Sequence, residues 1–168
     1  MLVWTRRSPS RKAMNIRFAE DRDIPALMRL LLQVNNVHAD IRPDLFLRDR
    51  RKYTQEELKD ILSQRESTPV FVAEEGDRVL GYAFCIRQRA RGENLVSHDT
   101  LYLDDLCVDE CAREKGVGSS LYRHLLCYAK EKGYYNLTLN VWEGNEGAIS
   151  FYRSRGMKIL KTQMEQIL

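Results

Sequence analysis

The sequence predicts a mixed α/β (α+β) domain, and three observations support this fold class. Short β-prone runs and amphipathic helical runs follow one another in the order β-α-α-β-β-β-α-β-α-β. Strands alternate with helices only in the second half, which suits neither an all-helical nor an all-β fold. At 168 residues, 43% of them hydrophobic, the chain is long enough for one domain with a substantial core.

The first elements are a strand and a helix. Residues 15–19 alternate between polar and apolar side chains, as in a strand. Asp23 is placed to cap a helix that tolerates Pro25 in its first turn. Two asparagines and a proline in 35–46 predict that a loop ends this helix.

A second helix and a hairpin follow. Thr54 has Glu57 three residues later, the spacing of a capping box, so we expect a helix to start there. The apolar runs 69–75 and 78–88 are joined at Gly76-Asp77, a pair typical of a β-hairpin turn.

The second half predicts five further elements. We expect a strand over 100–108 and a helix over 116–133. A strand over 136–141, a short helix over 145–156 and a final strand over 157–165 complete the order.

Basic residues gather at the start of the chain. Residues 1–13 hold Arg6, Arg7, Arg11 and Lys12 and no acidic residue. The whole chain has 27 Lys and Arg against 24 Asp and Glu, so the rest is close to neutral, which argues against a nucleic-acid-binding protein. No apolar run reaches the ~20 residues of a membrane span. We expect 1–13 to be an unstructured extension, or an upstream start with Met14 as the initiator, and 14–168 to be a single domain.

The cysteines and histidines do not form a metal-binding pattern. No two cysteines have the CxxC spacing, and His38 and His98 lie far from them in the sequence. Cys85 and Cys107 fall in apolar runs and are expected to be buried thiols, so a cytoplasmic protein is expected. The four cysteines are Cys85, Cys107, Cys111 and Cys127. The three histidines are His38, His98 and His124, and we expect His124 at the surface.

The turn Arg113-Glu114-Lys115-Gly116-Val117-Gly118 stands between a strand and a helix. Gly116 and Gly118 allow backbone torsions that a Cβ forbids and let a ligand approach the main chain. The first N–H groups of a helix have no partner within it and lie at the positive end of its dipole, so they suit an anion such as a pyrophosphate. The alternative is a plain strand-to-helix turn that uses glycine for packing.

The segment 101–158 resembles the GCN5-related N-acetyltransferase (GNAT) family. Arg-x-x-Gly-x-Gly after a strand ending in Val is similar to that family's acetyl-CoA pyrophosphate loop. The run "GNEGAISFYRSRGM" resembles its closing motif. The residues in the places of that motif are Asn145, Ala148, Phe151, Tyr152, Gly156 and Met157. The first half of the chain fits only in element order and in the strand that contains Gly81.

The resemblance implies a fold and a cofactor. The implied sheet is mixed, mostly antiparallel and six- to seven-stranded, splayed between its fourth and fifth strands, with about four helices. Acetyl-CoA would lie in the gap between 101–108 and 136–141. The implied cofactor contacts are Leu106, Cys107, Val108, Arg113, Glu114, Lys115, Gly116, Val117, Gly118, Ser119, Asn145, Ala148, Phe151 and Tyr152.

The implied chemistry needs an acid and a base. An attacking amine must lose a proton, and an acidic pair occupies this strand in the diamine acetyltransferases, so Asp104 is the first candidate and Asp105 the second. Neighbours on a strand face opposite ways, so we expect only one to reach the cleft, while the other forms an ordinary ion pair. Tyr152 is the candidate acid for the leaving thiolate, with a packing aromatic as the alternative. The N–H of Leu106 would stabilise the carbonyl oxygen.

The acceptor side is expected after the first helix, where His38, Arg42 and Phe46 would line it, although a solvated loop histidine is the commoner role for His38. In the ribosomal-protein alanine acetyltransferases a glutamate base follows the main helix on the next strand, and Asn140 holds that position here. Arg42 would suit an acceptor that carries a carboxylate, whereas the acidic pair would suit an acceptor with additional amines. Both kinds of acceptor remain open.

The expected function is acetyl transfer from acetyl-CoA to a primary amine by direct attack in a ternary complex. The alternative is a non-catalytic acyl-CoA-binding sensor on the same fold. A small amine, an amino acid, an antibiotic and a protein N-terminus all remain open as acceptors. A homodimer is a further possibility, and we expect neither nucleic acid nor a membrane as a partner.

Overall fold

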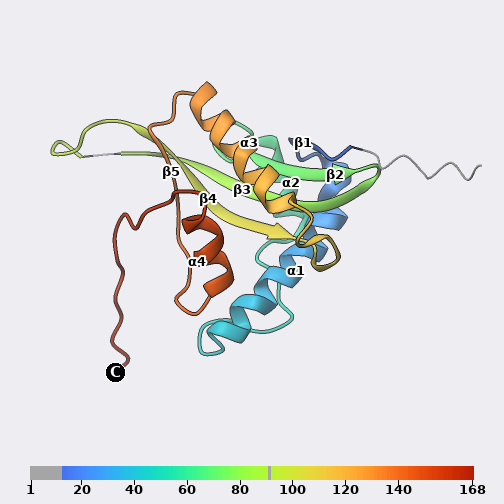
Figure 1. The fold of residues 1–168 in the computed structure, drawn as a ribbon, viewed down its shortest axis with the longest axis horizontal. Helices are drawn as coiled ribbons and strands as arrows, with labels where there is room; N and C mark the ends of the chain where they lie inside the picture. The colour runs from blue at the N-terminus through green and yellow to red at the C-terminus, as the bar shows by residue number, and fades with distance from the viewer. Residues whose placement is uncertain (1–12, 91) are drawn as a thin grey trace, which may run out of the picture.

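The computed structural model describes residues 13–90 and 92–168, and over these residues the chain forms one five-stranded sheet and four α-helices (Figure 1). The basic extension expected over 1–13 falls almost wholly outside them. The strands are β1 (Asn15–Phe18), β2 (Val70–Glu75), β3 (Arg78–Arg89), β4 (Asp99–Val108) and β5 (Asn136–Leu139). The helices are α1 (Ile24–Ile41), α2 (Gln55–Ser63), α3 (Val117–Glu131) and α4 (Glu146–Arg153), with 3-10 turns η1 (Asp21–Asp23) and η2 (Glu110–Ala112).

The strands lie in the order β1-β2-β3-β4-β5. The first three pairings are antiparallel and β4 pairs with β5 in parallel, as the mixed fold class predicted. Figure 1 shows α3 over one face of the sheet and α1 with α2 over the other. Along the described residues, no helix combines the length and apolarity that a membrane crossing requires.

Both faces of the sheet are buried, which explains the continuous apolar run in β2. Val70 and Val72 join the core under α1 and α2, whereas Phe71 and Ala73 join the core under α3. A strand covered on both faces needs apolar side chains at every position, so it does not alternate with polar ones.

The fourth and fifth strands part, as the resemblance implied. Residues Thr100 to Leu103 of β4 pair with Asn136 to Leu139 of β5, and β4 then continues to Val108 alone on that side. Backbone groups that β4 directs toward β5 beyond Leu103 therefore lack a strand partner.

The expectation of six or seven strands is wrong, because the sheet of the described residues has five strands and none after β5. The segment 157–165 is not a strand, and Figure 1 shows it as an extended chain that runs away from the sheet. Ile159 and Leu160 are adjacent and both are exposed, at 76% and 72%. Neither face of the segment stays apolar along its length, so pairing it with the sheet would bury polar side chains.

The first helix is longer than predicted. It continues through Asn35 and Asn36 to Ile41 because the asparagines bond the returning loop instead of breaking the helix. Asn35 Nδ2 donates to the Leu47 carbonyl at 2.8 Å, and Asn36 Oδ1 accepts from the Asp49 N–H at 2.9 Å. The helix ends just before Arg42-Pro43, where the residue before a proline is disfavoured in a helix.

Two predicted caps have different outcomes. The capping box at Thr54 is confirmed, because its Oγ1 accepts from the Glu57 N–H at 3.2 Å while the Glu57 carboxylate accepts from the Thr54 N–H. Asp23 stands at the start of α1 but its carboxylate makes no cap bond to that helix. It accepts instead from the Glu20 N–H and from the Arg17 guanidinium.

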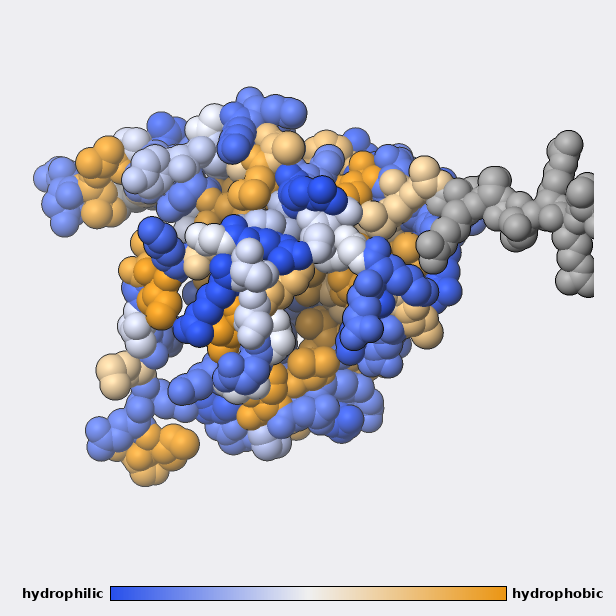
Figure 2. Space-filling model, in the orientation of Figure 1, coloured by the Kyte–Doolittle hydropathy of each residue, from blue (hydrophilic) through white to orange (hydrophobic). Residues whose placement is uncertain are grey.

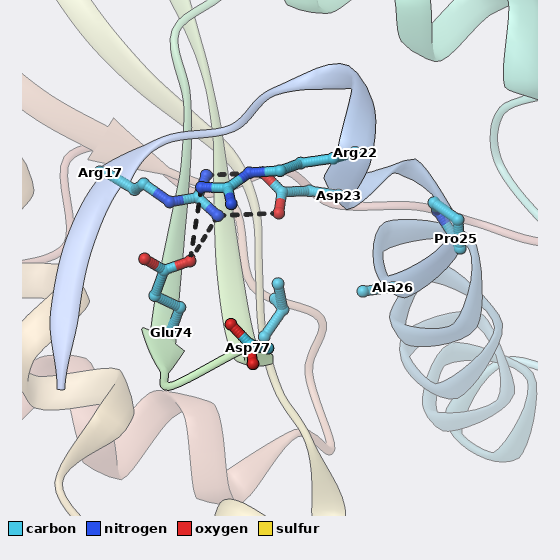
Figure 3. Close-up of a pocket in the computed structure, with 8 residues that line it drawn as sticks. Arg17, Arg22, Asp23, Pro25, Ala26, Glu74 and Asp77 are labelled. Atoms are coloured by element: carbon cyan, nitrogen blue, oxygen red, sulfur yellow. Dashed lines mark hydrogen bonds and ion pairs between the residues drawn. The ribbon is translucent and has the colours of Figure 1, made fainter. Parts of the chain in front are cut away.

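Arg17 joins β1 to its neighbours. Figure 3 shows its guanidinium between the carboxylates of Asp23 and Glu74, in the wall of a surface pocket. Hydrogen bonds to these two carboxylates raise the pKa of Arg17 above its ordinary value. Two carboxylates balance the charge of Arg17, so we regard this cluster as structural.

Asp109 anchors the end of β4. It is buried, and its Oδ2 accepts from Arg29 of α1 at 2.7 Å and from Arg78 of β3 at 3.2 Å. Its Oδ1 accepts from the Cys111 N–H, and its own N–H donates to the Leu80 carbonyl. One carboxylate therefore ties the chain after β4 to α1 and to the β2–β3 hairpin.

We expect Gly81→Ala to destabilise the fold by about 1–3 kcal/mol. A Cβ at Gly81 would lie 2.7 Å from the Cys107 carbonyl oxygen, a backbone atom that cannot yield without moving β3 from β4. The measurement is the free energy of unfolding in urea.

Gly147→Ala is the matched control, because a Cβ there meets nothing within 4 Å. It lies in α4, so alanine should raise the free energy of unfolding by about 0.4–1 kcal/mol. A Gly81→Ala protein as stable as the unchanged chain would contradict the close approach of the two strands.

Asp109 predicts an acid-sensitive part of the stability. Burial alone would raise the pKa of Asp109, but bonds from the Cys111 N–H and from the two arginines outweigh it and hold the pKa below 3.8. A lowered pKa stabilises the fold above the ordinary pKa, and this contribution is lost as pH falls through the folded value. Asp109→Asn should therefore cost about 1–3 kcal/mol at pH 7, with the difference shrinking below pH 3.8.

Unfolding in urea from neutral to acid pH measures this dependence. Asp60→Asn, which removes an exposed carboxylate on α2, is the control and should leave the free energy of unfolding nearly unchanged. A constant difference between Asp109→Asn and the unchanged chain at every pH would contradict this role of the Asp109 charge.

Candidate active site

The turn before α3 has the backbone shape of an anion cradle. Gly116 is the N-cap of α3 and is left-handed at φ +80°, and Glu114 is left-handed at φ +63°. Left-handed residues that alternate with residues of ordinary backbone conformation turn successive N–H groups toward one side of the chain. The exposed Arg113 and Lys115 add positive charge at its rim, although Lys115 also bonds the Cys111 carbonyl.

The N–H groups of this turn are not engaged by the protein. Among the described residues, the N–H groups from Glu114 to Ser119 make no well-aligned hydrogen bond to a protein acceptor. The first bond of the helix is made by Ser120, whose N–H donates to the Gly116 carbonyl at 3.0 Å. The turn therefore presents several main-chain donors at the positive end of the α3 dipole.

The fourth helix packs beside this turn. Arg155, just after α4, donates to the Ser119 hydroxyl and lies over the Phe151 ring, 3.9 Å from its centroid. A Cβ at Gly118 would meet Phe151 and Val108 at 3.5 Å, so that glycine sits close under α4. Asn145 caps α4, its Oδ1 accepting from the Ala148 N–H at 3.2 Å. Figure 2 shows the surface hollowed beside this region.

A β-bulge changes the directions of the acidic pair. Phe84 of β3 lies opposite Asp105 and the next residue, Cys85, lies opposite Leu103, so Asp104 is an extra residue without a partner. The expectation that Asp104 and Asp105 face opposite ways is therefore wrong. An extra residue reverses the alternation, and both carboxylates contact side chains on the α1 face.

The two carboxylates have different partners. Asp104 Oδ2 accepts from Lys52 Nζ at 2.6 Å and lies 3.4 Å from the Tyr53 hydroxyl. Asp105 Oδ2 accepts from the buried Tyr82 hydroxyl at 2.7 Å. Burial is the largest influence on Asp105 and raises its pKa to about 6, against the opposing effects of the Tyr82 bond and the Lys52 charge.

Tyr152 lies in α4 against Tyr122 of α3, with ring centroids 6.1 Å apart. Burial raises its pKa above the ordinary value, and the negative charge of Asp105 adds to this. Among the described residues, no protein group bonds its hydroxyl. The phenol thus stays protonated at neutral pH and is available as a donor.

The residues expected on the acceptor side come together. The His38 and Phe46 rings are 5.2 Å apart, and Phe46 meets Trp142 edge-on at 5.6 Å. His38 is on α1 and half-buried, not in a solvated loop, and burial lowers its pKa. Arg42 lies over Trp142 and pairs with Asp44 and Glu165, so its charge is already balanced. We call His38, Arg42, Phe46 and Trp142 the aromatic wall.

Asn140 lies just past β5 and donates from Nδ2 to the Tyr102 hydroxyl at 3.1 Å. This hydrogen bond orients the phenol of Tyr102, which lies on β4 close in sequence to the acidic pair. Burial raises the pKa of Tyr102, and the Asp104 charge adds to the increase.

The remaining candidates are structural. Cys85 and Cys107 are buried as predicted, and burial raises the pKa of both thiols, that of Cys107 to about 12. His124 was expected at the surface but is half-buried, 4.8 Å from the Phe71 ring. No group of three or more metal-ligating side chains occurs within the described ranges.

Several residues of the site carry no signal in the sequence. Lys52 and Tyr53 precede a helix and look like ordinary loop residues, and they reach Asp104 only through the fold. Trp142 follows a strand and could have been noticed only as an exposed aromatic. The residues that were missed are Lys52, Tyr53, Tyr82, Tyr102, Trp142 and Arg155.

Known proteins share this fold. A tetramutant of the BH1408 protein from Bacillus halodurans matches with a TM-score of 0.85 and 29% identity, over 92% of this chain and 99% of that one. A Trypanosoma brucei acetyltransferase matches with a TM-score of 0.69 and 21% identity, over 93% and 100%. A metagenomic aminoglycoside acetyltransferase matches with a TM-score of 0.67 and 18% identity, over 92% and 96%. The last two show the fold alone.

Curated relatives match shorter stretches. An uncharacterized N-acetyltransferase of Methanocaldococcus jannaschii is 28% identical over 97 residues, 58% of this chain and 42% of its own length. The probable N-acetyltransferase san of Drosophila melanogaster is 30% identical over 88 residues, 52% of this chain and 45% of its own. The matched stretches thus span less than half of these relatives.

The family model agrees with the site geometry. The model described as the acetyltransferase (GNAT) family matches residues 31–157, which include the acidic pair, the turn and α4. The matched domain is an N-acetyltransferase domain, in line with the names of the curated relatives. The chain belongs to the GNAT acetyltransferase family.

Proposed function

We propose that this chain transfers an acetyl group from acetyl-CoA to a primary amine by direct attack in a ternary complex. One observation carries the proposal: an acidic pair stands where β4 leaves β5, β4 then continues unpaired on that side to Val108, and a turn with unengaged N–H groups follows its end. A binding site for a diphosphate and a proton acceptor would thus lie at the two ends of one unpaired stretch of β4.

The residues present fit coenzyme A. The N–H groups between Arg113 and Ser119 would take its pyrophosphate, and the unpaired backbone of Leu106 to Val108 would bond the pantetheine arm as a strand would. Phe151 of α4 packs against Gly118 of this turn, and Asn145 caps the start of the same helix. Acetyl-CoA supplies an activated acetyl thioester there.

Asp105 is the better candidate for the base. A pKa of about 6 leaves it ionised at neutral pH yet still able to take a proton, the balance that general-base catalysis favours. Asp104 is held by Lys52 and is less free to do so. Asp104 then contributes by attracting the ammonium of the acceptor.

Leu106 and Tyr152 would complete the chemistry. The Leu106 N–H lies two residues past the bulge beside the Asp105 carboxylate, and we propose that it would donate to an oxygen that gains negative charge. The pKa of Tyr152 lies above its ordinary 10, whereas a thiol has a pKa of ~8.5. Its hydroxyl therefore stabilises a departing thiolate by donating a hydrogen bond more readily than by giving up its proton.

The charges favour a cationic acceptor. Arg42 was a candidate for a substrate carboxylate, but its guanidinium already faces Asp44 and Glu165. The acidic pair attracts an ammonium, and the aromatic wall provides a surface for an apolar or cationic part of the molecule. The acidic pair also favours catalysis over a CoA-binding sensor, which needs no base.

The unengaged turn predicts that coenzyme A stabilises the chain. CoA and acetyl-CoA should raise the melting temperature increasingly with concentration. Gly116→Ala should weaken the affinity for CoA about tenfold, or ~1.4 kcal/mol, because the left-handed backbone that aims the N–H groups is strained by a Cβ. Isothermal titration calorimetry gives both affinities.

Gly133→Ala is the control for strain. Gly133 ends the same helix, is also left-handed at φ +74° and also has nothing within 4 Å of its Cβ position. It should lose similar stability but bind CoA as before. Equal affinities in the two variants, or no binding by the unchanged chain, would contradict the proposed cofactor site.

Asp105 predicts the pH dependence of turnover. The ionised form is the active one, so kcat/KM should fall as pH drops through about 6. Asp105→Asn should lower kcat by about 10²–10⁴ and remove this dependence. Rates of thiol release with a primary amine acceptor, measured from pH 5 to 9, test it.

Asp104→Asn is the comparison. The charge of Asp104 raises the pKa of Asp105, so its removal should move the fall in rate to lower pH without abolishing it. If Asp104→Asn abolishes the dependence and Asp105→Asn keeps it, the roles of the two carboxylates are reversed.

A further inference from the structure

A primary amine of the protein already pairs with one member of the acidic pair. Lys52 lies in the loop between α1 and α2, and its Nζ is 2.6 Å from Asp104 Oδ2. Asp104 is the first residue of β4 beyond Leu103, where pairing with β5 stops. The Lys52 nitrogen therefore stands at the place where an acceptor amine would meet the acidic pair.

The surroundings of this nitrogen are those of the proposed site. Its charge lies 5.4 Å from the centroid of the Tyr53 ring. It also lowers the pKa of Asp105, Tyr102 and His38, so all three lie within its electrostatic reach. The side chain is 47% exposed, so its nitrogen can be reached from solvent.

We propose that Lys52 is itself an acetyl acceptor, so that the chain acetylates its own Nζ. The inference rests on the proposed function, because the same base and the same thioester serve both reactions. No other lysine among the described residues pairs with either member of the acidic pair.

The step balances without a further reactant. The Lys52 ammonium gives one proton to a carboxylate, and the resulting amine forms a C–N bond to the acetyl carbon. The C–S bond of acetyl-CoA breaks, the nitrogen loses a second proton as the amide forms, and the leaving thiolate takes that proton up. The products are Nε-acetyl-lysine and CoA.

Acetylation would change the charge of the site. The amide of acetyl-lysine is neutral, so Asp104 would lose its ion-pair partner. The Lys52 charge lowers the pKa of Asp105, so its loss would raise that pKa. Modified protein should therefore need higher pH for its activity, which makes Lys52 a means of self-regulation.

Peptide mass spectrometry of the full chain after incubation with acetyl-CoA tests the inference. Lys59, an exposed lysine on α2, is the internal control for uncatalysed acetylation. Lys52 should be acetylated at least about a hundredfold faster than Lys59, the contribution expected of a positioned base. The fraction modified per unit time should not depend on protein concentration, because the reaction is intramolecular.

Two further measurements make the result decisive. Asp105→Asn, checked for folding by circular dichroism, should slow acetylation of Lys52 but not of Lys59. Chain unfolded in urea should modify both lysines at equal rates. Equal rates in the folded chain, or a Lys52 rate unaffected by Asp105→Asn, would overturn the inference.

Failure of this inference is distinguishable from failure of the proposed function. If the chain binds CoA and acetylates an added amine while Lys52 stays unmodified, only the self-acetylation is wrong. If it neither binds CoA nor acetylates an added amine, both are wrong. Lys52→Arg keeps a cation beside Asp104 but has no primary amine to acetylate, so the modified peptide should disappear.

Discussion

The candidate site depends on the place where β4 and β5 cease to pair. The parallel ladder ends at Leu103, and the next residue, Asp104, is the extra residue of a bulge in the pairing with β3. The end of the ladder leaves backbone donors and acceptors of β4 without strand partners. The bulge turns both Asp104 and Asp105 to one face of the sheet. Together they bring main-chain groups that can bind an extended ligand beside a pair of carboxylates, and α4 and the turn before α3 pack together near the end of β4.

Features with local causes could be predicted from the sequence. The capping box at Thr54 needs only Glu57, three residues on, and the left-handed turns at Gly76 and Gly116 need only the absence of a Cβ. The parting of the two strands was also expected, but through the family motifs and not through any local pattern. Such features depend on torsions and on neighbours within one helical turn, so a single sequence contains their causes.

Features with distant causes could not be predicted. The asparagines of α1 look like helix breakers, but their partners Leu47 and Asp49 lie 12 and 13 residues away and keep the helix intact. The bulge exists only in the register of β3 with β4. The ion pair of Lys52 with Asp104 joins residues that are 52 positions apart. Each of these contacts exists only in the assembled fold, so no local pattern in one sequence can reveal it.

The charges of the site explain why an acceptor should be cationic. Asp104 and Asp105 are adjacent, and one ammonium, that of Lys52, stands against them. If Lys52 left without a replacement, repulsion between the two carboxylates would raise the pKa of Asp105 further and protonate the base that the reaction needs. An incoming ammonium that takes the place of Lys52 keeps the charge constant. The exchange replaces one ion pair with another, so it avoids the cost of leaving a partly buried carboxylate without a partner. A substrate carboxylate gains no such compensation, because Arg42 already has two carboxylates as partners.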